Sequence, residues 1–90
     1  MIKNLYAIRD KLTGYMNPAP EDNDLVAMRA VSHAVKSDVL NTINAKPEDF
    51  TLNCIGEYDT ETGVITPCPV RVVCEVSNLI EKEVKKGGKK

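Results

Sequence analysis

The stretch from Asp10 to Pro20, DKLTGYMNPAP, recurs 49 residues later from Asp59 to Pro69 as DTETGVITPCP. Five of the eleven positions are identical, and two more hold large apolar residues in both copies. The Asp of each copy is suited to accept hydrogen bonds from amides further along a turn, and the Gly suits a positive φ at the end of a hairpin loop. The prolines are expected to stop each returning strand, because proline cannot donate to a ladder. The repeated stretch therefore predicts two hairpins.

The segments that precede the two copies have the pattern of strands. Residues 2–10 alternate, with Tyr6 and the isoleucines on one face, which indicates a half-buried strand. Residues 50–58 also alternate until Ile55, beside Gly56, breaks the pattern, and a bulge is expected there. These two segments are the outgoing strands of the hairpins.

The segments that follow the two copies differ. After the first, a helix is predicted from a cap at Asp22 or Asn23 through about Lys36, with one apolar stripe formed by Leu25, Met28, Val31, Ser32 and Val35. Residues 37–46 are ambiguous, and residues 47–50 predict a turn. After the second copy, residues 64–66 predict a short return strand and residues 70–76 a further strand, because they are rich in β-branched side chains. A last helix is predicted from Ser77.

Two explanations of the repeat remain open at this point. Asp, Thr, Gly and Pro recur in turns for local reasons, so the likeness can be convergent. Alternatively, the chain is a duplicated ββα unit with pseudo-twofold symmetry. Both predict an α+β fold, in which a small antiparallel sheet of two hairpins and an extra strand packs with two helices on one face, in the order ββαβββα. We expect one domain over residues 1–86 and a disordered basic tail over residues 87–90.

The charge of the chain is unevenly distributed. The net charge is −1, yet residues 82–90 hold five lysines and one acid, whereas residues 1–81 hold seven bases and twelve acids, a balance of −5. An acidic body attracts nucleic acid poorly, so any phosphate contact should involve the tail. No run of apolar residues is long enough for a membrane span, and the first residues lack a secretion signal, so neither a membrane nor export is expected.

The residues that usually carry chemistry do not form a recognisable constellation. Three cysteines with no CxxC pair argue against a disulfide framework and, with His33, lack the close spacing of a structural zinc site. His33 is alone on a helix face, and Asp59 and Glu61 lack the ligand periodicity of a calcium loop. We therefore expect no enzyme, no metal and no cofactor.

The lysine-rich end is the remaining candidate for binding. Its five lysines are suited to non-specific contact with DNA phosphates, or else they form a solvated terminus. The three tyrosines could stack on unpaired bases, but in a chain with one Phe and no Trp they are expected to serve as core aromatics. The candidate DNA-binding residues are Lys82, Lys85, Lys86, Lys89 and Lys90.

Several segments together resemble the small non-structural protein of gokushoviruses, which are Microviridae with single-stranded DNA genomes. The resemblance spans roughly residues 3–80 and excludes the lysine-rich end. It rests on residues 4–10, 13–18 and 32–35 in the first half, and on residues 47–50, Leu52, residues 55–56 and residues 58–63 in the second half.

The resemblance implies a bacteriophage protein that acts in the cytoplasm of the bacterial host. It implies a role in viral DNA replication, in the change to single-stranded DNA synthesis, or in DNA packaging, and it transfers no catalytic residue. The acidic body favours contacts with phage replication or procapsid proteins, with weak DNA contact through the tail. Two alternatives are a single-stranded DNA-binding module and a host-directed accessory protein. A homodimer through an exposed edge strand, 64–66 or 70–76, is also open.

Overall fold

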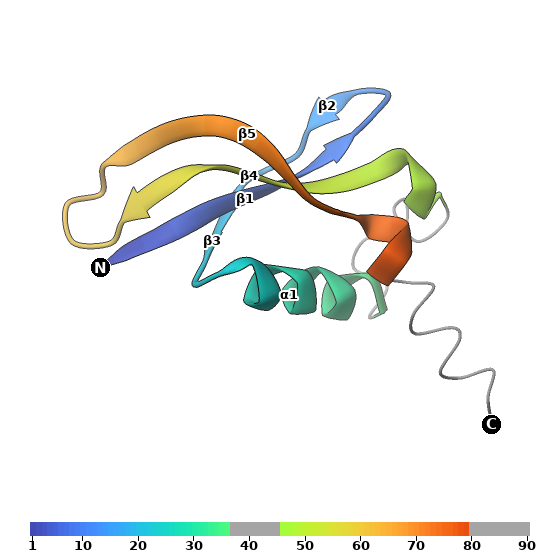
Figure 1. Cartoon of the computed structure of the whole chain (residues 1–90), viewed down its shortest axis with the longest axis horizontal. Helices are drawn as coiled ribbons and strands as arrows, with labels where there is room; N and C mark the ends of the chain where they lie inside the picture. The colour runs from blue at the N-terminus through green and yellow to red at the C-terminus, as the bar shows by residue number, and fades with distance from the viewer. Residues whose placement is uncertain (37–45, 80–90) are drawn as a thin grey trace.

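The computed structural model describes residues 1–36 and 46–79 of the 90-residue chain (Figure 1). Residues 76–79 are helical and follow directly on the last strand. The other elements, in chain order, are β1 (Ile2–Asp10), β2 (Gly14–Tyr15), β3 (Ala19–Glu21), α1 (Asp24–Lys36), the 3₁₀ turn η1 (Pro47–Asp49), β4 (Phe50–Asp59) and β5 (Ile65–Glu75).

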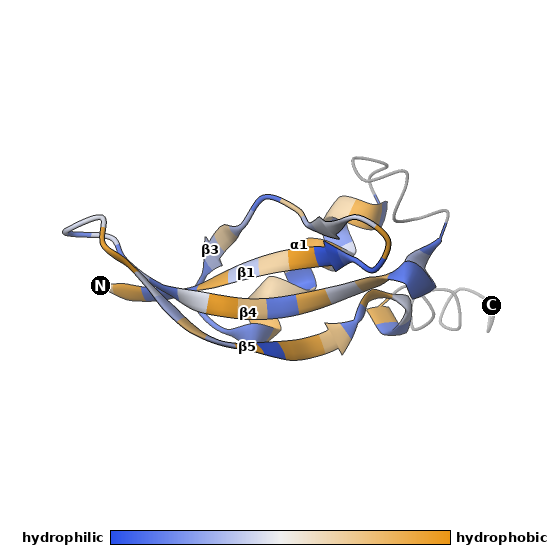
Figure 2. Ribbon diagram, turned by 90° about the horizontal axis from the view of Figure 1, so that it is seen from above, coloured by the Kyte–Doolittle hydropathy of each residue, from blue (hydrophilic) through white to orange (hydrophobic). Residues whose placement is uncertain are grey.

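The strands form one antiparallel sheet in the order β2-β1-β4-β5, and β3 pairs with the same edge of β1 as β2 does. The long strands β1 and β4 are neighbours at its centre. Figure 2 shows β1, β4 and β5 side by side as three long, strongly twisted ribbons. The predicted α+β fold, with a small antiparallel sheet and two helices, is confirmed.

Both predicted turns are present and use the same chemistry. The carboxylate of Asp10 accepts a hydrogen bond from the amide of Leu12, and the carboxylate of Asp59 accepts one from the amide of Glu61, each at 2.9 Å. Gly14 and Gly63 both have a positive φ, of 116° and 78°. The repeated stretch therefore encodes two reversals in which the Asp and the Gly have the same roles, because only glycine adopts such φ values at little cost.

The prediction that the prolines stop the return strands is wrong for the second hairpin. β5 runs without interruption through Pro67 and Pro69, and the two strands predicted at 64–66 and 70–76 are one. Proline is tolerated here because β5 is at the edge of the sheet, where a missing N–H leaves no neighbour unpaired. The extra strand lies instead in the first half, where the return path is divided into β2 and β3.

A bulge in β4 allows the two hairpins to join. Leu5 pairs with Gly56 and Tyr6 pairs with Cys54, so Ile55 is the extra residue, as its sequence position predicted. Gly56 is required at this point, because a Cβ there would lie 2.7 Å from the carbonyl oxygen of Thr66 on β5. The close approach of β4 and β5 therefore depends on the absence of a side chain.

The helices cover one face of the sheet, as predicted (Figure 1). Helix α1 begins behind Asn23, whose side-chain oxygen accepts a hydrogen bond from the amide of Val26 at 2.9 Å. Of the two caps predicted, Asp22 and Asn23, it is Asn23 that the structure shows in this role, and residues 19–21 before it belong to β3. The buried core on this face consists of two adjoining clusters, Tyr6, Ala27, Leu52 and Cys54 in one and Val35, Phe50 and Val76 in the other.

One member of the predicted helical stripe is misplaced. Leu25 is 76% exposed, whereas Ala27 is 2% exposed and faces the sheet. Leu25 and Ala27 are two positions apart and lie on nearly opposite sides of the helix, so the side that places Ala27 against the sheet points Leu25 towards solvent. The other predicted apolar residues of the stripe, Met28, Val31 and Val35, do pack against the core.

Candidate docking surface

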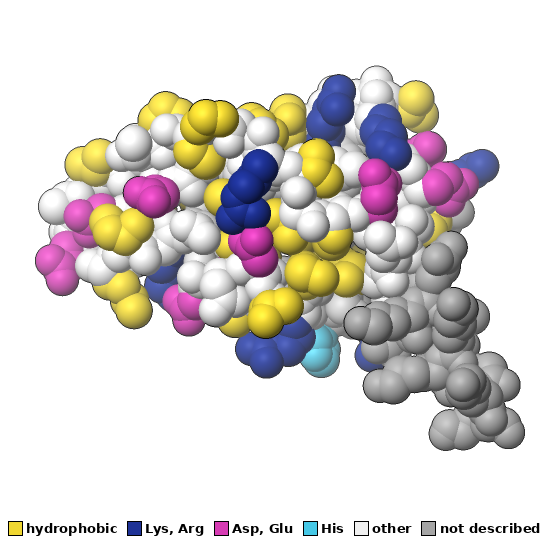
Figure 3. All heavy atoms as spheres, viewed as in Figure 1, with side chains coloured by type: hydrophobic (Ala, Val, Ile, Leu, Met, Phe, Trp, Pro, Cys, Tyr) yellow, Lys and Arg dark blue, Asp and Glu magenta, His cyan; other side chains and the backbone are white. Residues whose placement is uncertain are grey.

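Strand β5 is the most exposed long element of the sheet. It pairs with β4 on one side only, so in the described part of the chain its other edge has no strand partner. Three aliphatic side chains along it, and one in the residue directly before it, are 53–62% exposed. We call this group the β5 surface: Val64, Ile65, Val70 and Val72. Figure 3 shows hydrophobic side chains gathered over the part of the molecule where Figure 1 places β5.

The β5 surface differs from the centre of the same sheet face. Val72 pairs with Asn53, which in turn pairs with Ala7, so the three side chains share the face opposite the helices. Asn53 is 2% exposed, and its amide donates to the carbonyl oxygen of Ala7 and to the hydroxyl of Thr51. The polar side chain at the centre of this face is thus hydrogen-bonded within the chain, whereas the valines at the border of the face are exposed to solvent.

Edge strands are usually protected by charges, prolines or bulges against pairing with other chains. In β5 the prolines protect residues 67–69, and a register shift between Leu52 and Asn53 of β4 marks a further irregularity near Val73. Its two charged residues are both in ion pairs: Arg71 with Asp24, and Glu75 with Lys11. The valines therefore stand beside charges that are already neutralised, which favours contact with another protein.

A polar clamp holds β5 to the start of α1. Both guanidinium NH groups of Arg71 donate to the carboxylate of Asp24, at 2.8 and 3.0 Å. The hydroxyl of Tyr6 donates to the same carboxylate at 2.6 Å, and Asn4 donates to that hydroxyl at 3.0 Å. The clamp joins β1, α1 and β5, and it orients the strand that carries the exposed valines.

The clamp shifts the titration of its members. Hydrogen bonds from Arg71 and then from Tyr6 lower the pKa of Asp24 below its usual value. Burial, followed by the hydrogen bond to Asp24, raises the pKa of Tyr6. Both shifts favour an ionised Asp24 beside a neutral Tyr6 at neutral pH, which are the protonation states in which these hydrogen bonds form.

The described residues provide no arrangement for metal binding. Within 1–36 and 46–79, no group of three His, Cys, Asp or Glu side chains could hold a metal ion. All three cysteines are free, and burial raises the pKa of Cys68 and Cys74, which keeps these thiols protonated. His33 is exposed on α1. No helix in the described part of the chain has the length and apolar character needed to cross a membrane.

The candidate DNA-binding lysines, 82, 85, 86, 89 and 90, lie outside the described residues, as does the predicted domain end at residue 86. The tyrosines differ in how deeply they are buried. Tyr6 is buried in the core as predicted, whereas Tyr15 is 52% exposed, and the guanidinium of Arg9 lies 5.8 Å from the centre of its ring. Sequence reasoning named both parts of β5 as possible edge strands but missed the clamp, because Asp24 and Arg71 are 47 residues apart.

Comparisons with known proteins identify a family. A family model described as "Phage ORF5 protein" matches residues 3–79. No curated protein and no solved structure matches the chain. The match covers β1 through the helical residues that follow β5, which includes the β5 surface and the clamp. The chain belongs to the Phage ORF5 protein family.

Proposed function

We propose that this phage protein is a non-enzymatic, non-structural factor of gokushoviruses that supports viral DNA replication, single-stranded DNA synthesis or packaging by docking onto phage replication or procapsid proteins. It acts in the cytoplasm of the host bacterium. The observation that carries the proposal is the β5 surface, an open strand edge bordered by exposed aliphatic side chains. Strand edges of this kind receive a partner strand through main-chain hydrogen bonds, with side-chain pockets adding specificity.

The charges of the body support a protein partner over DNA. Basic side chains of the described residues form ion pairs with acids, among them Lys3, Lys11, Lys46 and Arg71. Arg9 lies against Tyr15. Residues 1–81 have a net charge of −5, and most of their basic side chains already contact other residues. This part of the chain is therefore expected to attract a phosphate backbone only weakly.

The docking proposal is tested by capture from lysates of phage-infected cells. Val72→Lys places a charge on the open edge and should abolish capture of a phage protein, because edge lysines block strand pairing. Leu25→Lys is the matched control, since Leu25 is equally apolar and even more exposed but lies on α1. Equal capture by both variants would contradict docking through β5.

The same variants separate the other possible occupants. If β5 pairs with a second copy, sedimentation of the purified protein will show a dimer that Val72→Lys dissociates. If the protein is a host-directed accessory factor, uninfected lysate will yield the captured partner. Only a phage replication or procapsid protein, captured from infected lysate alone, supports the proposal.

The role in genome synthesis is tested by infection with a phage that lacks this protein. Accumulation of single-stranded progeny DNA should fall while duplex DNA persists. Normal progeny DNA with reduced host takeover would overturn the proposed role in favour of the host-directed one.

Weak DNA contact is proposed for the lysine-rich end, and it is the feature that favours a single-stranded DNA-binding module as second candidate. Affinity for oligonucleotides should fall with salt and disappear when residues 82–90 are deleted. Strong, salt-dependent binding that is lost when these residues are deleted would favour the second candidate. Absence of binding at low salt would remove DNA contact from the function.

A further inference from the structure

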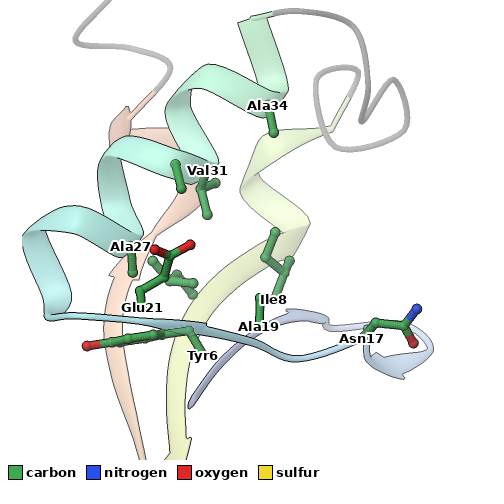
Figure 4. Close-up of a pocket in the computed structure, with 10 residues that line it drawn as sticks. Tyr6, Ile8, Asn17, Ala19, Glu21, Ala27, Val31 and Ala34 are labelled. Carbon is green, nitrogen blue, oxygen red and sulfur yellow. The ribbon is translucent and has the colours of Figure 1, made fainter. Parts of the chain in front are cut away.

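A pocket of about 170 Å³ lies between α1 and the sheet, at the first hairpin and away from the β5 surface (Figure 4). Helix α1 contributes Ala27, Ala30 and Val31 to its wall, and the strands contribute Ile8 and Leu52. The alanines recur at a helical spacing, so they lie on one side of α1, and their short side chains do not fill the space above the sheet. The result is an apolar slot that is large enough for a side chain.

Glu21 is the single carboxylate that lines this slot. It pairs with Asn4 across β3 and β1, and Asn4 is bonded to Tyr6, so Glu21 is on the helix face of the sheet. Figure 4 shows Glu21 projecting from β3 on the side of the pocket where Ala27 and Val31 lie. Within the described part of the chain, its carboxylate has no hydrogen bond and no ion pair.

The neighbouring cations are engaged elsewhere. Lys3 forms an ion pair with Asp22 at 3.1 Å, and Arg71 is held by Asp24 at 2.8 Å. An apolar occupant that covered Glu21 would strip water from an uncompensated charge, and an anion would be repelled. The pocket therefore selects an occupant with an apolar body and a positive end.

We infer that the pocket receives a lysine or arginine side chain from a basic segment of a protein partner. These side chains lay an aliphatic stem along an apolar surface while the charged head meets a carboxylate. A basic partner also suits the acidic body of this chain, whose balance over residues 1–81 is −5. That the side chain belongs to a protein partner rests on the proposed docking function. The preference of the pocket for a cation with an aliphatic stem does not depend on that function.

The preference is measurable on the purified full-length protein with small probes. n-Pentylammonium mimics a lysine side chain, and 1-pentanol and pentanoate have the same chain length with no charge or a negative charge. In amide NMR titrations, n-pentylammonium should shift resonances of residues 19–21 and 27–34, pentanol should bind more weakly, and pentanoate should not bind. Equal binding of all three probes, or no binding of the ammonium, would overturn the inference.

Two variants show whether the carboxylate and the slot are both needed. Glu21→Gln should weaken n-pentylammonium binding about fivefold and leave pentanol binding unchanged, because it removes the charge and keeps the shape. Glu57→Gln is the control, since Glu57 is an exposed acid on β4 that does not line the pocket. If both variants weaken binding equally, the general acidity of the body explains the effect and the inference is wrong.

Ala30→Leu should abolish binding of both n-pentylammonium and pentanol by filling the slot. Ala30 is exposed on α1, so the fold should tolerate the larger side chain, and an unchanged amide spectrum away from the pocket checks this. Retained binding in Ala30→Leu would show that the probes bind elsewhere. These tests use neither phage nor partner, so their failure would leave the proposed function standing, and failure of β5 docking would leave the pocket standing.

Discussion

The two halves of this molecule start alike and end differently. Residues 2–36 and residues 50–79 each run as a long central strand, an Asp-x-x-Thr-Gly turn, a return strand with Pro-x-Pro, and a helix on the same face. β1 and β4 are antiparallel neighbours, so the halves are arranged about the centre of the sheet as a duplicated unit would be. This arrangement favours the duplication over convergence of two turns.

The difference lies in the return strands. The first leaves the ladder after Met16, rejoins it at Ala19 and ends at Glu21, whereas the second continues to Glu75. The cause is local: Asn23 supplies a helix cap soon after the first return strand, while the corresponding residues of the second half are β-branched and extended. The turn motif therefore sets the chain reversal, and the residues after the turn set the length of the return strand.

This difference gives each half its own surface. The short first return strand brings α1 in early and leaves the apolar pocket with Glu21 between helix and sheet. The long second return strand forms an open edge with exposed valines. The proposed docking edge and the proposed basic-side-chain pocket are therefore products of the same asymmetry.

The largest expected effect tests the contact that is specific to the second half. Gly56→Ala should destabilise the protein by about 3 kcal/mol, because its Cβ would meet the backbone oxygen of Thr66 at 2.7 Å and force β4 and β5 apart. The corresponding residue 49 positions earlier is Ala7, whose Cβ the first half already accommodates. Urea unfolding measures the loss, and a cost of Gly56→Ala below about 1 kcal/mol would contradict this account.

The next effect tests whether the two turns are equivalent. Gly63→Ala and Gly14→Ala should each cost about 1–2 kcal/mol, because alanine disfavours a positive φ although open space surrounds both positions. Thermal or urea unfolding of the two variants provides the comparison. A cost at only one of the two glycines would show that the halves do not use the repeated turn in the same way.

The smallest effect tests the clamp that joins the halves. Asp24→Asn should cost about 1 kcal/mol at neutral pH, since the carboxylate is partly exposed and accepts bonds from Arg71 and Tyr6. Asp22→Asn is a nearby control whose carboxylate is more exposed and, among the described residues, pairs with Lys3 alone. Equal costs for the two variants would mean that the clamp adds nothing beyond an ordinary surface ion pair.

The clamp also predicts a pH dependence. The pKa of Asp24 is lowered in the folded state, so its stabilising contribution is present above the ordinary Asp value of about 4 and is lost as the pH falls through the lower folded value. The difference in unfolding free energy between the wild type and Asp24→Asn should therefore shrink below about pH 4. A difference that is constant down to pH 2 would contradict the assigned ionisation.

The sequence predicted the elements better than their junctions. The alternation in residues 2–10, the bulge at Ile55 and the Asn23 cap were all visible, because each depends on neighbours in the chain. The continuity of β5 through Pro67 and Pro69 was not, because proline is excluded from a central strand but tolerated on an edge, and strand order is not encoded locally. The exposure of Leu25 escaped prediction for a similar reason, since helix periodicity alone does not reveal which side of α1 approaches the sheet.

By itself, the sequence determined the two reversals, the fold class and the family resemblance, because Asp, Gly and Pro act through the backbone of their own turns. Only the tertiary structure decided which strand became the open edge, that Asp24 meets Arg71, and that Glu21 faces an apolar slot beneath the alanines of α1. These features join residues far apart in the chain. They exist because packing the helices against one face leaves the pocket on that face and the β5 edge open to solvent.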